Sequence, residues 1–158
     1  MSNTIVLNNI SKKFVTNKKI SVLNKISYKF VKGKIYSIVG PSGSGKSTLL
    51  NIISLIDKPS RGNIKIFNKE INYNNISNND VTRARNIGII YQQNNLLPDF
   101  TALENVYLAR LALQNNKNDA LQKAKKLIQR MGLINRIDHY PSELSGGEMQ
   151  RIAIARAL

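Results

Sequence analysis

The sequence predicts an α/β fold, a core of strands and helices that carries a helical insert. Three observations predict it. Residues 34–40, "KIYSIVG", are almost wholly apolar apart from Ser37, as in a strand that is buried on both faces. A glycine-rich loop and a helical pattern follow at once. From Thr101 onward the apolar residues recur with a helical period.

The first half of the chain reads as short strands around one helix. β-type runs lie at 4–10 and 25–33, before the buried run at 34–40. A helix is expected over "GKSTLLNIISLID", 45–57, and "KPSRG" closes it.

Two further strands and a loop are expected before the helical insert. "NIKIF", 63–67, alternates as a strand, and "NIGIIYQ", 86–92, reads as a second buried strand. The asparagine-rich stretch between them, 68–80, is expected to be an exposed loop.

Three helices are expected in the rest of the chain. Thr101 and Glu104 form a capping box that opens an amphipathic run to about Leu113. A second helix is expected over 118–131, ended by Gly132. A second capping box, Ser145 with Glu148, opens the final helix.

Composition narrows the class of protein. The 42% apolar and 21% charged residues are ordinary for one soluble globular domain of 158 residues. The start of the chain lacks a signal-peptide core, so a cytoplasmic location is expected. The net charge of +15 suits a polyanionic partner, but the basic residues are scattered and not interleaved with aromatics.

The loop "GPSGSGKST" fits the pattern G-x-x-x-x-G-K-[ST] between a predicted strand and a predicted helix. Gly40, Gly43 and Gly45 let backbone N–H groups approach phosphate oxygens, and the helix N-terminus adds partial positive charge. Lys46 would reach the β- and γ-phosphates, and the Ser47 hydroxyl would ligate Mg²⁺. The alternative is a glycine-rich turn that binds nothing.

"ELSGGEMQ" carries a second candidate site. Two glycines in the first turn of a helix cost about 1–2 kcal/mol relative to alanine. A ligand that needs close approach to the backbone N–H groups would justify this cost, but the residues alone leave both interpretations open.

The order and spacing of three segments resemble those of ATP-binding cassette (ABC) ATPases. They are the phosphate loop, "YQQNNLLP" and "LSGGEMQRIAIARAL", and Leu144 follows Gly40 by 104 positions. The resemblance covers essentially the whole chain. It implies a P-loop NTPase core with a RecA-like mixed sheet, an antiparallel β subdomain and a helical insert, in an α/β fold whose C-terminal part is missing.

The resemblance implies a part for each matching residue. Nucleotide contacts fall on Phe14, whose ring would stack on adenine, and on Gly40, Pro41, Ser42, Gly43, Ser44, Gly45, Lys46, Ser47 and Thr48. Gln92 would reach Mg²⁺ and the attacking water, so Lys46 and Gln92 are the catalytic candidates and Ser47 and Gln92 the metal candidates. Phe14 as an ordinary core residue and Gln92 as a solvated turn residue are the alternatives.

The signature residues would bind the ATP of a second cassette. In this family two cassettes hold two ATP molecules head to tail, which accounts for the double glycine. The residues concerned are Leu144, Ser145, Gly146, Gly147, Glu148 and Gln150. His139, the only histidine, lies before the signature and is expected to be an ordinary loop residue.

The expected organisation is a β subdomain and phosphate-loop core over 1–92, a helical subdomain over 93–145 and the start of the signature helix over 145–158. The family pattern continues with a strand ending in Asp-Glu and a switch histidine, and neither is present here. A fragment or a truncated reading frame is therefore expected, with weak ATP binding or aggregation and no turnover by itself.

The leading hypothesis is the ATP-binding subunit of an ABC transporter, most similar to the lipoprotein-releasing and macrolide-exporter ATPases. It would act as a homodimer with ATP and Mg²⁺, beneath membrane permease subunits at the cytoplasmic face of the inner membrane. One alternative is a nucleic-acid-acting ABC ATPase, although the short separation of the motifs and the lack of cysteine argue against nucleic acid as a partner. Another is a non-catalytic cassette that binds ATP and pairs with a complete one.

Overall fold

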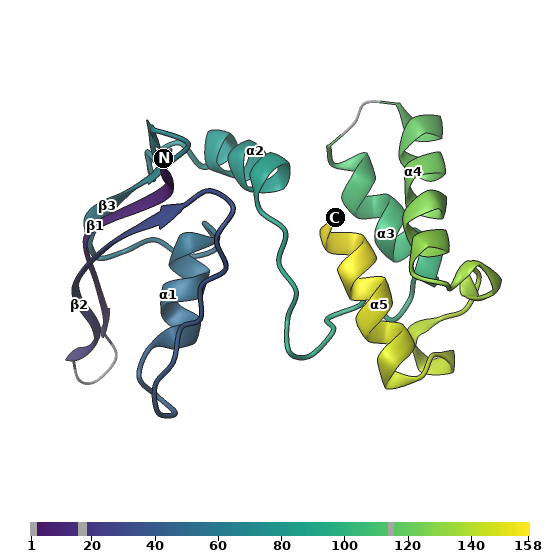
Figure 1. Cartoon of the computed structure of the whole chain (residues 1–158), viewed down its shortest axis with the longest axis horizontal. Helices are drawn as coiled ribbons and strands as arrows, with labels where there is room; N and C mark the ends of the chain where they lie inside the picture. The colour runs from purple at the N-terminus through teal and green to yellow at the C-terminus, as the bar shows by residue number, and fades with distance from the viewer. Residues whose placement is uncertain (1–2, 16–18, 114–115) are drawn as a thin grey trace. The chain divides into compact units, whose positions relative to one another are not determined.

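The structure is a computed structural model that describes residues 3–15, 19–113 and 116–158. It forms two compact units, residues 1–83 and 84–158. The elements of the first unit, in chain order, are β1 (Asn3–Val15), β2 (Lys19–Val31), α1 (Lys46–Ile53), β3 (Arg61–Ile66), β4 (Lys69–Glu70) and most of α2 (Ile76–Asn86). All of them except β4 are labelled in Figure 1.

The strands of the first unit form one antiparallel sheet in the order β2-β1-β3-β4. Leu7 and Ile10 are both buried although they lie three residues apart on β1. This is possible because the ladder to β2 shifts register between them, at Asn9, whose φ is 49°. Such a bulge turns the strand so that both side chains reach the same interior. The antiparallel β subdomain that the resemblance implies is therefore present.

Two strands expected from the sequence are wrong. Neither residues 34–40 nor residues 86–92 form a strand of the described chain, and Asn86 is the last residue of α2. The side chains of Ile35 and Val39 are 101% and 85% exposed, so the run at 34–40 is not buried on either face. The apolar pattern reports which residues suit a buried strand, whereas a strand forms only where neighbouring strands supply hydrogen-bond partners.

The exposed loop expected at 68–80 is also wrong in part, because it contains β4 and the start of α2. Phe67 and Asn68 both have positive φ and join β3 to β4 as a two-residue hairpin turn. Further on, the Asn75 side chain accepts a hydrogen bond from the N–H of Asn78 at 3.1 Å and so caps α2. The asparagines thus serve turns and caps as well as loops.

The second unit is helical and matches the helices expected from the sequence. Its elements are α3 (Ala102–Leu111), α4 (Lys117–Arg130), the short 3₁₀ helices η1 (Ile134–Arg136) and η2 (Pro141–Glu143), and α5 (Gly146–Ala157). Both predicted capping boxes are confirmed, at the starts of α3 and α5. The three long helices enclose a core made of Ala102, Val106, Ala124, Ile128, Leu133, Leu144, Ile152 and Ala155.

Candidate functional site

The glycine-rich loop, residues 40–48, lies in the first unit and leads directly into α1. Gly45 caps α1 in the left-handed region, with φ of 90°, and makes no side-chain hydrogen bond to the helix. A Cβ atom at Gly45 would lie 2.9 Å from Leu23 Cδ2, so both the backbone conformation and the contact with β2 require glycine. The first N–H groups of α1 are therefore left without a side-chain cap, which is what an anion at a helix N-terminus needs.

The side chain of Lys46 is hydrogen-bonded to the backbone of this loop. Its Nζ donates to the carbonyl oxygens of Gly40 at 2.9 Å and of Pro41 at 2.8 Å. The ammonium group thus lies beside the loop backbone that would bind phosphate. A bound phosphate would be a further hydrogen-bond acceptor for it. Ser47 is exposed in the first turn of α1.

The single hydroxyl oxygen of Ser47 fits the way in which proteins bind Mg²⁺ beside a nucleotide. This ion takes most of its ligands from water and phosphate oxygens and few from the protein. Ser47 is in the first unit, whereas Gln92, the other metal candidate, is in the second. Among residues 3–15, 19–113 and 116–158, the structure has no group of three or more His, Cys, Asp or Glu side chains that could hold a metal ion.

Phe14 lies near the end of β1 and is 42% exposed. Its ring is approached by Lys12 Nζ, 5.0 Å from the ring centroid. Lys12 is itself fixed by an ion pair of 2.6 Å with Asp57 Oδ1. The exposed ring face is compatible with stacking on a base, and the stacking itself stays a prediction.

The signature residues lie in the second unit, at the start of α5. The Ser145 hydroxyl accepts a hydrogen bond from the N–H of Glu148, and the Glu148 carboxylate accepts from the N–H of Ser145. A Cβ atom at Gly146 would meet nothing within 4 Å, and one at Gly147 only the tip of Arg151 at 3.9 Å. Packing among the described residues gives no reason for either glycine, which is compatible with a ligand at this place.

The other predicted signature residues differ in exposure. Leu144 is 6% exposed and belongs to the core of the second unit, whereas Gln150 is exposed on α5. Leu144 therefore packs the start of α5 onto the core of the second unit, and its contact with a ligand stays a prediction.

Gln92 is exposed in the irregular segment before α3, and the residues that follow it are tied to α5. Arg156 donates from Nη1 to the carbonyl oxygen of Asn95 at 2.6 Å and from Nη2 to that of Asn94 at 2.9 Å. Gly88 lies so close to α5 that a Cβ atom there would be 2.3 Å from the Ala157 carbonyl oxygen. The segment that carries Gln92 is therefore fixed to the signature helix on both sides.

The structure thus places the predicted residues in two groups. The phosphate loop and Phe14 belong to the first unit, and Gln92 and the signature to the second. Sequence reasoning missed three residues that hold these groups: Asn105, Arg136 and Arg156. Only Asn105 had a visible signal, a polar residue inside an amphipathic helix, because the contacts of the two arginines link distant positions.

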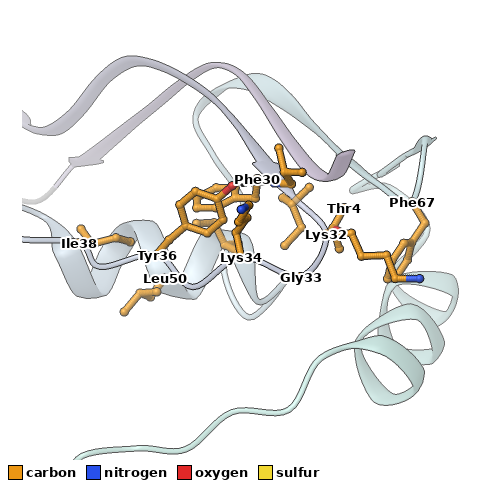
Figure 2. A pocket seen from close by; sticks show the side chains of 12 residues that line it. Thr4, Phe30, Lys32, Gly33, Lys34, Tyr36, Ile38, Leu50 and Phe67 are labelled. Carbon is orange, nitrogen blue, oxygen red and sulfur yellow. Dashed lines mark hydrogen bonds between the residues drawn. The ribbon is translucent and has the colours of Figure 1, made fainter. Parts of the chain in front are cut away.

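A separate pocket of about 460 Å³ lies in the first unit, between the end of β2, residues 34–38 and α1 (Figure 2). Tyr36, Ile38 and Leu50 are among its mostly apolar lining. Tyr36 packs edge-on against Phe30, with ring centroids 5.0 Å apart, and its hydroxyl accepts from the N–H of Val31. None of residues 40–48 lines this pocket, so it is distinct from the phosphate loop.

In the part of the chain that the structure describes, no helix has both the length and the apolar character needed to cross a membrane.

Comparison with protein families matches residues 23–158 to the model of the ABC transporter family. Among curated proteins, the chain is 44% identical over 160 residues to the lipoprotein-releasing system ATP-binding protein LolD of Rickettsia bellii. That match covers the whole of this chain and 70% of the relative. The LolD protein of Saccharophagus degradans is 49% identical over 122 residues, which are 77% of this chain and 54% of the relative. The chain thus spans between about half and 70% of the length of these relatives.

Among solved structures, the dimeric bacterial ABC transporter cassette MJ0796 superposes with a TM-score of 0.88 at 38% identity. The match covers 98% of this chain and 68% of the cassette. A second dimeric structure of MJ0796, in a post-hydrolysis state with ADP and phosphate, matches equally well, with a TM-score of 0.88. The predicted fold class, a P-loop NTPase of the ATP-binding cassette type, is confirmed by these likenesses.

Proposed function

The chain belongs to the ABC transporter family, and from this premise we propose that it is part of an ATP-binding subunit that drives a separate membrane permease. The observation that carries the proposal is the loop at 40–48. It joins Lys46, held over the loop backbone, to the uncapped N-terminus of α1. This is the arrangement that binds nucleotide phosphates in P-loop proteins.

In the proposed site, each group of the chain has a defined task. The N–H groups of the loop and of the first turn of α1 would bind the phosphate oxygens, and Lys46 would balance their charge. Phe14 would stack on the base with its exposed face. Mg²⁺, when bound beside Ser47, supplies further neutralisation of the phosphate charge. Gln92 is proposed to orient the attacking water.

The family's reaction is ATP hydrolysis, and the proposed assembly is a pair of copies. The signature at the start of α5 would bind the terminal phosphate of the nucleotide held by the second copy. The open space around Gly146 and Gly147 supports this, because an outside ligand can reach the N–H groups there. MJ0796, at 38% identity, is a dimeric cassette.

The substrate class is proposed from the curated relatives. Rickettsia bellii LolD, at 44% identity over the whole of this chain, is an ATP-binding protein of a lipoprotein-releasing system. We propose the same process here, at the cytoplasmic face of the inner membrane. Nucleic acid is not proposed as a partner.

Residues 1–158 by themselves are proposed to bind ATP without measurable turnover. They contain the phosphate loop but no strand ending in Asp-Glu, the acidic pair that the family uses to hold Mg²⁺ and to polarise water. Loss of a general base alone commonly lowers a rate by about 10²–10⁴-fold.

The substitution Lys46→Ala tests the nucleotide site. We expect ATP affinity to fall about 10–100-fold, because a hydrogen bond to a charged group contributes about 1.5–3 kcal/mol. Titration calorimetry with ATP and Mg²⁺ measures the affinity, and circular dichroism checks the fold. Lys29→Ala, which removes an exposed lysine of β2, is the matched control and should bind as the wild type does. Equal affinity in the Lys46 variant would refute the proposed site.

A further inference from the structure

Arg136 makes two side-chain contacts beside the signature. Its Nε donates to Glu148 Oε1 at 3.1 Å, and its Nη1 lies 3.2 Å from His139 Nε2. The Arg136 side chain is 47% exposed, whereas that of Glu148 is only 17% exposed. The ion pair therefore links the end of η1 to the first turn of α5.

The peptide segment that carries Arg136 is itself fixed to α3. The carbonyl oxygen of His139 accepts from the N–H of Ala102 at 2.8 Å, and that of Ile137 accepts from the N–H of Leu103 at 2.9 Å. These bonds satisfy two N–H groups at the start of α3 that would otherwise lack a partner within the helix. Arg136 thus extends from a backbone that is anchored independently of α5.

The second carboxylate oxygen of Glu148 accepts hydrogen bonds from Ser145. Its Oε2 accepts from the N–H of Ser145 and from the Ser145 hydroxyl, both at 2.8 Å. These bonds from the backbone and then the side chain of Ser145, with a smaller contribution from Arg136, lower the pKa of Glu148 to about 2. Glu148 is therefore a carboxylate anion throughout the physiological range.

A carboxylate at this place conflicts with the proposed function, on which this inference rests. If the first turn of α5 binds the terminal phosphate of a second copy's nucleotide, two anions meet at one helix end and repel each other. In addition, the Ser145 hydroxyl has one hydrogen, which Glu148 and the phosphate would share or compete for. Arg136 is the cation in contact with Glu148, and its charge offsets the carboxylate.

We propose that Arg136 is a positioning residue for the signature: it neutralises Glu148 and holds it on Ser145, so that the start of α5 accepts an anionic phosphate from a second copy. Arg136 acts through Glu148 and does not touch the nucleotide. His139 is the second side chain in contact with the guanidinium group.

The test measures how strongly two copies of the full-length protein pair in the presence of a non-hydrolysable ATP analogue. Sedimentation velocity gives the dissociation constant of the pair, and calorimetry gives the affinity of the separate chain for ATP. We expect Arg136→Gln to weaken pairing about tenfold or more, since two signatures lose a charge-assisted bond, and to change ATP affinity less than about twofold. Arg136→Lys, which keeps the charge, should recover part of the pairing.

A double substitution separates this role from simple loss of stability. Because Arg136 acts through Glu148, Arg136→Gln combined with Glu148→Gln should pair no worse than Glu148→Gln alone. Arg130→Gln removes an exposed arginine at the end of α4 and is the matched control, which should pair as the wild type does. Melting temperatures of all variants report on the fold.

Three results would overturn the inference. Arg136→Gln could pair as tightly as the wild type, or the losses from Arg136→Gln and Glu148→Gln could multiply in the double variant. The third is a wild type that binds ATP but never pairs. That result refutes the proposed binding between copies as well, and it is recognised because the wild type itself fails.

Discussion

Asn105 organises the loop between the Gln92 segment and α3 by itself. It is 2% exposed, and its Oδ1 accepts from the N–H of Leu97 at 2.8 Å. Its Nδ2 donates to the carbonyl oxygens of Leu97, Phe100 and Thr101 at distances of 2.9–3.1 Å. A single buried amide thus replaces the secondary-structure hydrogen bonds that this part of the backbone lacks.

Replacing Asn105 is therefore expected to be costly. Asn105→Ala should lower the free energy of unfolding by about 2–4 kcal/mol, because several backbone groups lose their partner at a buried position. Urea unfolding, followed by circular dichroism of the helical signal, measures the change. Gln122→Ala, at an exposed position of α4, is the control and should change it by less than about 0.5 kcal/mol. A small effect at Asn105 would mean that the loop does not depend on this amide.

Among the helices, α5 connects the signature to the segment that carries Gln92. Its start carries the capping box and the ion pair with Arg136, and its end holds the Gln92 segment through Arg156. Its middle buries Ile152 and Ala155 in the core of the second unit. The signature and the Gln92 segment are thus attached to opposite ends of one helix.

The capping box of α5 makes stability depend on pH in a defined direction. The pKa of Glu148 is lowered from 4.5 to about 2 in the folded chain, chiefly by hydrogen bonds from Ser145. A lowered pKa means that the contribution of Glu148 to stability is complete above about pH 4.5 and is lost as the pH falls towards 2. The difference in free energy of unfolding between the wild type and Glu148→Gln should therefore shrink over this range.

Urea unfolding of both proteins at a series of pH values between 6 and 2 checks this expectation. A difference that stays constant, or grows as the solution becomes more acidic, would contradict the role of the Glu148 carboxylate in the cap. Ser145→Ala removes the hydroxyl partner and should reduce the pH dependence as well.

For the molecule as a whole, the residues of the proposed function are distributed over the two compact units. The first carries the groups for the nucleotide of its own chain, and the second carries the signature and Gln92. The chain belongs to the ABC transporter family, and its LolD relatives are ATP-binding proteins of lipoprotein-releasing systems. The net charge of +15 is compatible with phosphate ligands and with an anionic membrane surface.

The proposed process can be tested by expressing this protein together with the permease genes of a lipoprotein-releasing system. In bacteria depleted of their own LolD, expression of all these genes should restore the sorting of outer-membrane lipoproteins, measured by membrane fractionation. The Lys46→Ala protein should fail to restore it, because nucleotide binding drives the process. Rescue by the Lys46 variant would contradict the need for nucleotide binding at this loop, and normal ATP hydrolysis without rescue would argue for another transported substrate.

Local features of this protein follow from short stretches of sequence. The loop "GPSGSGKST" and the capping boxes at Thr101 and Ser145 were predictable because glycine conformation and capping act between residues that are close in sequence. The helical unit was predictable for the same reason, since its apolar period repeats every few residues. The family likeness rests on these same motifs.

Contacts between distant positions could not be derived in this way. Residues 34–40 and 86–92 have the composition of buried strands, yet neither forms a strand in the described chain, because a strand depends on neighbours that its own sequence does not specify. The ion pair of Arg136 spans 12 positions and the bonds of Arg156 span more than 60. Folding alone brings these groups together, and it is these contacts that hold the signature and the Gln92 segment in place.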